Sequence, residues 1–150
     1  MEQSNIMENT IKSPIYGDLL YTEDQVYQFE QGIIGFSAIS SYALFAYEDT
    51  ALYVLHALED EVSFLLVPSS IVAIEMEFKV DQQTIELLNA TVPTDLSLFY
   101  IVHIVDDQPY INVKAPILLV TSSNKGCQYI IHDPKYPIRE KLIMKELDTC

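Results

Sequence analysis

The chain has 150 residues, of which 49% are hydrophobic, so it can form one domain with a single sizeable core. Its 22 acidic residues against 8 basic ones give a formal net charge of −14, which disfavours direct binding to nucleic acid or to an anionic membrane surface. The acidity is uneven, because residues 1–110 contain only two of the basic residues and residues 111–150 contain the other six. This balance favours solubility and a partner with a basic surface.

From the N-terminus, residues 1–17 are mixed and polar, and they predict an N-terminal arm. Because Glu2 and Glu8 lie near the start and no apolar segment accompanies them, we expect no signal peptide. Short apolar segments then recur between acidic turns: Tyr42–Tyr47, Leu52–Leu58 and Val62–Val67. Connections this short predict antiparallel hairpins. None of these segments is long enough to cross a membrane.

Apolar and charged residues alternate over Ile74–Val80, which predicts a strand with a solvated face that carries Glu75 and Glu77. One helix is expected, with Asp81 as its N-cap and its end near Asn89. The later predicted elements are a strand, a turn and a hairpin across residues 122–126: Leu96–Val105, Asp106–Pro109, and Ile117–Thr121 with Cys127–His132.

Many short strands with tight turns and one brief helix predict an all-β fold, either a small antiparallel β-barrel or a barrel-like sandwich with one short helix. We expect residues 18–142 to form this domain and residues 143–150 to form a C-terminal tail. Cys127 and Cys150 are too few for a disulfide framework, so we expect one packed thiol and one loose terminal thiol. These features together favour a cytoplasmic protein.

The sequence contains no GxSxG, P-loop or GxGxxG motif, and nothing else in it specifies an enzyme. His103 would hold a metal only if the following turn brought Asp106 and Asp107 to it, and we favour a strand histidine beside a solvated turn. We therefore expect no catalytic site, no metal and no cofactor. The alternative is a small β-barrel enzyme or ligand-binding protein, with a cleft that joins a histidine to carboxylates.

Two interpretations of the acidic segments stay open. Glu59, Asp60 and Glu61 form either a solvated turn or an electrostatic docking patch, which Glu75 and Glu77 extend. Charged turns are common on soluble proteins, whereas the scarcity of basic residues before residue 110 favours a patch.

Five segments, in chain order, resemble motifs of the flagellar assembly factor family FliW: Phe29–Phe36 (F-x-x-G-I-P-G-F), Leu55–Asp60 (L-Q-S-x-x-D), Asn112–Ile117 (N-L-K-A-P-I), Gly126-x-Gln128 (G-x-Q) and Tyr136–Arg139 (Y-x-x-R). We expect the motif residues to specify turns and core contacts: Gly32, Gly35, Phe36, Asn112, Ala115, Pro116, Gly126, Gln128, Tyr136 and Arg139. Gly32, Gly35 and Gly126 are expected to adopt positive φ, and Arg139 is open to a local ion pair with an acidic neighbour.

The chain departs from the family pattern at four positions: Ile34, Ser37, His56 and Ala57. The resemblance implies a barrel-like protein without catalytic activity that binds flagellin and the translational repressor CsrA. It further implies that binding relieves CsrA repression of flagellin translation, until unpolymerised flagellin takes the protein away. Glu59, Asp60, Glu61, Glu75 and Glu77 are our candidate residues for contact with CsrA.

Overall fold

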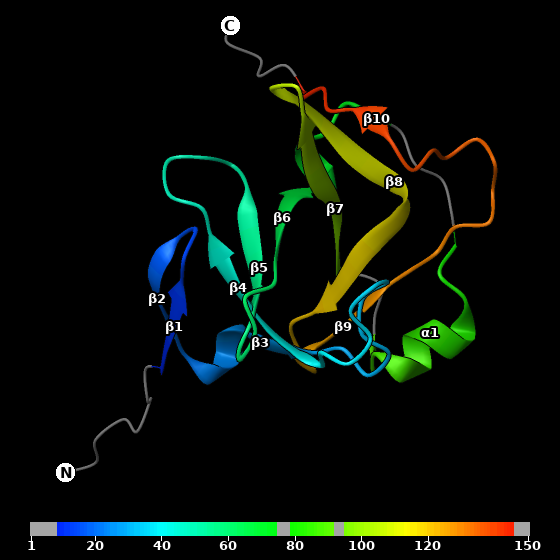
Figure 1. Cartoon of the computed structure of the whole chain (residues 1–150). Coiled ribbons are helices and arrows are strands. Elements are labelled where there is room, and N and C mark those ends of the chain that lie inside the picture. Colours follow the sequence, from blue (N-terminus) through cyan, green and yellow to red (C-terminus); the bar gives the residue numbers. More distant parts are fainter. Residues whose placement is uncertain (1–8, 75–78, 92–94, 146–150) are drawn as a thin grey trace, which may run out of the picture.

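The computed structural model describes residues 9–74, 79–91 and 95–145, and within them seven strands close into a β-barrel (Figure 1). Around the barrel the order is β8–β7–β6–β5–β4–β3–β9, and β9 pairs back with β8. The strands are β3 (Val26–Gln28), β4 (Ser41–Ala46), β5 (Tyr53–Ala57), β6 (Ser63–Pro68), β7 (Leu96–Val105), β8 (Gln108–Val120) and β9 (Lys125–Gln128). The predicted all-β barrel is confirmed. Its pairs are antiparallel except at the seam, where β3 and β9 run parallel.

The predicted hairpins are confirmed. Strands β4, β5 and β6 follow one another in antiparallel register, with Leu55 opposite both Leu44 and Phe64. The helix α1 (Gln82–Leu87) begins after Asp81, whose Oδ1 accepts a hydrogen bond of 2.8 Å from the backbone N of Thr84. The predicted strand over Ile74–Val80 falls mostly outside the described residues, since Glu75–Phe78 are not among them, and its flanking residues belong to no strand.

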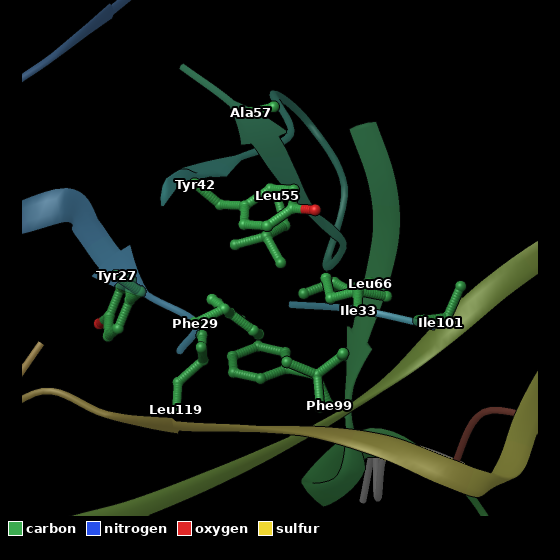
Figure 2. Packing of buried hydrophobic residues seen from close by; sticks show 11 residues of the cluster. Tyr27, Phe29, Ile33, Tyr42, Leu55, Ala57, Leu66, Phe99, Ile101 and Leu119 are labelled. Atoms are coloured by element: carbon green, nitrogen blue, oxygen red, sulfur yellow. The ribbon is translucent and has the colours of Figure 1, made fainter. Parts of the chain in front are cut away.

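Apolar side chains from six of the barrel strands and from the segment after β3 fill the interior. Figure 2 shows them pointing toward one another. The rings of Phe29 and Tyr42 pack edge to face, with their centres 5.2 Å apart. The cluster consists of Tyr27, Phe29, Ile33, Tyr42, Leu55, Ala57, Leu66, Phe99, Ile101, Ile117 and Leu119. Such interdigitated packing of both apolar and aromatic residues leaves the barrel filled.

The outer wall of the barrel is apolar as well, and segments of the same chain cover it. A hairpin of β1 (Asn9–Ser13) and β2 (Gly17–Tyr21) packs on Ala43, Phe45 and Val54. Part of the expected N-terminal arm, residues 9–13, is therefore a strand. Residue Leu88 after α1 packs on Leu118, Val120 and Cys127. Burial raises the pKa of the Cys127 thiol to about 12, with a smaller contribution from Asp81, as suits the packed thiol that we expected.

A third segment, which follows β9, covers the outer face of β7 and β8. Ile131 and Tyr136 pack there on Tyr100, Val102 and Ile111. The short strand β10 (Glu140–Lys141) then adds to the edge of β8. The remaining elements are two single turns of 3₁₀ helix, Glu23–Gln25 and Ser69–Ile71. No helix in the described part of the chain is long and apolar enough to cross a membrane.

The expectation of a positive φ at Gly126 is wrong. Gly126 lies within β9, and the left-handed residue of the preceding turn is Asn124, at φ 55°. A Cβ at position 126 would lie 2.7 Å from Phe29 Cζ and 2.7 Å from Leu119 Cδ2. Gly126 is therefore required by the close approach of two core side chains, not by a turn.

The seam between β3 and β9 depends on one side chain. Asn124 Nδ2 donates hydrogen bonds to the carbonyl oxygens of Asp24 and Val26, at 3.0 and 2.9 Å. Among the described residues, a single strand pairing crosses the seam and joins Gln28 to Lys125, and Gln28 N donates a further backbone hydrogen bond to Asn124 O. The side chain of Asn124 thus supplies hydrogen bonds where β3 and β9 have few backbone–backbone ones.

We expect Asn124→Ala to lower the free energy of unfolding by about 1–2 kcal/mol more than Asn89→Ala, because about 1 kcal/mol is typical of one hydrogen bond. Asn89 is a matched control, since it also has a left-handed φ, of 53°, and its side chain makes no hydrogen bond among the described residues. Urea unfolding of the two variants measures the difference. Equal losses would show that the seam does not depend on the Asn124 side chain.

Candidate partner-binding surface

Three of the sequence motifs meet at the side chain of Gln128. Its Oε1 accepts a hydrogen bond of 2.8 Å from the backbone N of Ile34, and its Nε2 donates one of 3.3 Å to the carbonyl oxygen of Ala115. Ile34 and Gln128 are far apart in sequence, so these bonds are tertiary contacts. They fasten the loop of residues 29–40 to strands β8 and β9.

The Asn112–Ile117 motif is an excursion of β8 away from β7. Ile101 pairs with Asn112 and Phe99 pairs with Ile117, so four residues of β8 have no partner on β7. Asn112 Oδ1 accepts a hydrogen bond of 3.0 Å from Ala115 N within this excursion. Pro116 needs no partner for a backbone N–H, which is why proline is tolerated at such a bulge.

The same excursion holds the segment after β9. The backbone N atoms of Val113 and Lys114 both donate to the carbonyl oxygen of Pro137, at 3.1 and 3.0 Å. Lys114 Nζ donates to the carbonyl oxygen of Ile131 at 3.0 Å. Tyr136, whose ring is buried, lies beside this contact in the core layer. The structure therefore brings the last motif against the third one.

The loop of residues 29–40 turns two apolar side chains outward. Gly32 and Gly35 have φ values of 68° and 89°, as expected, and a Cβ at Gly32 would lie 2.6 Å from Ser37 Cα. Between the glycines the chain buries Ile33 in the barrel and leaves 61% of Ile34 exposed. Phe36 is 39% exposed, and its ring packs edge to face on Phe64 at 5.5 Å.

The acidic turn lies beside this loop. Glu59, Asp60 and Glu61 are exposed in the connection from β5 to β6. Leu58 N donates to the carbonyl oxygen of Ser41, where the 29–40 loop ends. Tyr42, which follows the loop, pairs with Ala57 directly before the acidic connection, so the turn lies at this end of the barrel. Burial raises the pKa of the Tyr42 hydroxyl to about 12, and the charge of Asp60 adds to the shift.

We call the exposed residues of these two loops the motif-loop surface: Ile34, Phe36, Glu59, Asp60 and Glu61. It combines apolar side chains with carboxylates, an arrangement that suits a partner with apolar and basic groups. Sequence reasoning treated Ile34 only as a departure from the family pattern, and no local signal placed it beside the acidic turn. The other two candidate residues, Glu75 and Glu77, lie outside the described residues.

The histidines do not form a common site. His56 is buried in β5 with its Nδ1 2.8 Å from the carbonyl oxygen of Ala57, whereas His103 and His132 are exposed on β7 and beyond β9. Among the described residues, no three histidine, cysteine or acidic side chains are grouped to hold a metal ion. The motif residue Arg139 makes no ion pair in the described ranges, and its guanidinium lies over the ring of Tyr110.

A small closed β-barrel with an exposed apolar and acidic rim is typical of a protein-interaction domain. A crystal structure of the flagellar assembly factor FliW has the same fold, with a TM-score of 0.82 and 27% identity over 90% of this chain and 97% of that chain. The flagellar assembly factor FliW of Caldicellulosiruptor bescii is 28% identical over 137 residues, or 89% of this chain and 90% of the relative.

The protein of the same description from Lachnoclostridium phytofermentans is 31% identical over 147 residues, covering 84% of this chain and 88% of the relative. A family model described as FliW protein matches residues 10–142. The chain therefore belongs to the FliW family of flagellar assembly factors. The resemblance inferred from the five motifs is confirmed.

Removal of the Gln128 amide tests how the 29–40 loop is held. We expect Gln128→Met to speed hydrogen exchange at the Ile34 amide about fivefold, because one hydrogen bond of about 1 kcal/mol protects that amide. Nuclear magnetic resonance measures the rate in the folded protein. Gln83→Met on α1 is the control, since Gln83 is exposed and far from the loop in sequence. An unchanged Ile34 rate in Gln128→Met would contradict this assignment.

Proposed function

We propose that this protein is a cytoplasmic, non-enzymatic regulator of flagellar assembly that binds flagellin and the translational repressor CsrA. Binding to CsrA antagonises its repression of flagellin translation, and accumulated flagellin monomers take the protein away from CsrA. The observation that carries the proposal is membership of the FliW family, together with the motif-loop surface that the family-like segments build. The fold and the family support a role in flagellar assembly, and the two partners are the proposed part.

Charge supports CsrA as the partner of the motif-loop surface. A protein that binds RNA needs a surface that attracts phosphates, and Glu59, Asp60 and Glu61 present the opposite charge. Once docked, these carboxylates repel RNA phosphates, so they oppose RNA binding without covering the whole RNA site. Exposed Ile34 and Phe36 supply the apolar contact that holds the complex after the charges have guided encounter.

Reversal of the acidic charges distinguishes the residues that govern the association rate from those that govern the dissociation rate. We expect Glu59→Lys/Glu61→Lys, and likewise Glu75→Lys/Glu77→Lys, to slow association with CsrA about tenfold with little change in dissociation, because rim charges chiefly steer encounter. Ile34→Ser is expected to speed dissociation several-fold, since it removes an apolar contact of about 1 kcal/mol. Surface plasmon resonance at 0.1 M and 0.5 M salt measures both rates.

The control is Glu48→Lys/Glu86→Lys, which changes the net charge equally at two exposed positions: Glu48 lies in the β4–β5 connection, at the opposite end of β5 from the acidic turn, and Glu86 lies on α1. Its association rate should fall much less than that of Glu59→Lys/Glu61→Lys. If the two variants associate equally slowly, net charge acts alone and the acidic turn is only a solvated turn. Thermal unfolding confirms that each variant is folded.

Partner exchange predicts that the two ligands oppose one another. We expect an excess of monomeric flagellin to displace labelled CsrA from its complex with this protein, because binding of either partner lowers the affinity for the other. Fluorescence anisotropy follows the displacement, and size-exclusion chromatography shows whether flagellin itself has bound. A ternary complex that retains all of the CsrA would overturn the exchange model while leaving both binding activities intact.

A further inference from the structure

A second exposed surface, of opposite charge, lies on β7, β8 and β10. Tyr110 of β8 pairs with His103 of β7 on one side and with Lys141 of β10 on the other. Residues that are directly opposite in neighbouring strands point to the same face of the sheet. The three side chains therefore form one row across three strands, while Glu140, which pairs with Ile111, points to the other face.

Arg139 adds a second positive charge to this row, beside that of Lys141. Its guanidinium carbon lies 5.6 Å from the centre of the Tyr110 ring, at a distance typical of a cation–π contact. The aromatic face attracts the guanidinium without using its N–H donors, so these can still bind a partner. We call His103, Tyr110, Arg139 and Lys141 the basic row.

Neither Arg139 nor Lys141 forms an ion pair among the described residues. The ion pairs formed there join Lys125 to Glu30 and Lys135 to Asp133, and neither includes Arg139 or Lys141. Both side chains are exposed, although 22 acidic residues are available in the chain to neutralise them. The local ion pair that the sequence left open for Arg139 is replaced by the contact with Tyr110.

An exposed apolar side chain adjoins the basic row. Ile138 precedes Arg139 and is 66% exposed, whereas Ile104 follows His103 in β7 and therefore points to the other face of the sheet. Arginine and tyrosine are among the residue types most enriched at the energetic centres of protein interfaces. Arg139 over the Tyr110 ring, with Lys141 in the same row and Ile138 beside it, is complementary to a segment that alternates carboxylates with apolar residues.

We infer that the basic row binds an acidic, extended segment of a protein partner, with carboxylates on Arg139 and Lys141. A protein segment fits better than nucleic acid, because the apolar residues between its carboxylates can contact exposed Ile138, whereas a phosphate backbone offers only charge to a chain of net charge −14. The basic row does not depend on the partners proposed above. In Figure 1, β10 lies at the top of the barrel, whereas β9 lies at the bottom.

The probe for the test is a fluorescein-labelled twelve-residue peptide in which Glu alternates with Val, and fluorescence anisotropy measures its binding in 0.05 M salt. We expect the wild-type chain to bind it, and Arg139→Glu/Lys141→Glu to weaken binding at least tenfold. Arg139→Lys should weaken binding several-fold, because lysine keeps the charge but loses the planar guanidinium that can bind a carboxylate through two N–H groups. A peptide with Lys in place of Glu should not bind to this surface.

The matched control is Lys12→Glu/Lys79→Glu, which changes the net charge equally at two exposed lysines that lie outside the basic row and form no ion pair among the described residues. It should keep binding within about threefold of wild type, after thermal unfolding has shown that all variants are folded. No binding of the peptide by the wild-type chain, or equal losses in the two charge-reversed variants, would overturn the inference. Tight binding of a single-stranded RNA, lost in Arg139→Glu/Lys141→Glu while the peptide fails to bind, would assign the row to nucleic acid instead.

Discussion

The barrel closes at β9, where the Phe29 ring packs closely against the backbone of Gly126. A side chain at position 126 would force these groups apart, because its Cβ would lie within 2.8 Å of two atoms of that ring and of Leu119 Cδ2. With β9 between β8 and β3, the Asn124 side chain donates to Val26 across the seam, and Gln128 accepts a hydrogen bond from the backbone N of Ile34. The position of the exposed loop is thus a consequence of packing in the interior.

Local patterns predicted much of this fold because they are set by nearest neighbours. The hairpins from β4 to β6 and the Asp81 cap follow from short acidic turns and from one capping residue. Strand β8 was expected only from Ile117, because Pro116 is a signal against a continuous strand, yet the excursion at residues 113–116 accommodates it. The glycine at position 126 was attributed to a positive φ, whereas the structure shows close approach of Phe29 and Leu119. Such a steric requirement between distant residues leaves no local pattern in the sequence.

The candidate site divides in the same way. Exposure of Glu59, Asp60 and Glu61 follows from three adjacent charges in a turn. Their position near the loop of residues 29–40 depends on how β4 and β5 pair, and the position of Ile34 in that loop depends on the Gln128 bond; both are contacts between distant segments. The sequence did not predict strand β1, because Ile11 is the one apolar residue among its five and gives no alternating pattern. The strand is stabilised by packing on the outer wall of the barrel that it covers.

The covered wall has a consequence for how this protein changes over evolutionary time. Ala43, Phe45, Val54, Leu118 and Ile111 face outward from the barrel and are nevertheless buried by other segments of the same chain. No partner can reach them without first unfolding part of the chain, so substitutions there alter solubility and lifetime rather than choice of partner. Variation in binding therefore falls on the exposed positions, which include the loops at the barrel ends, the edge at β10 and the outer side of the covering segments, where Ile15 and Leu20 are exposed, and these can diverge while the barrel remains the same.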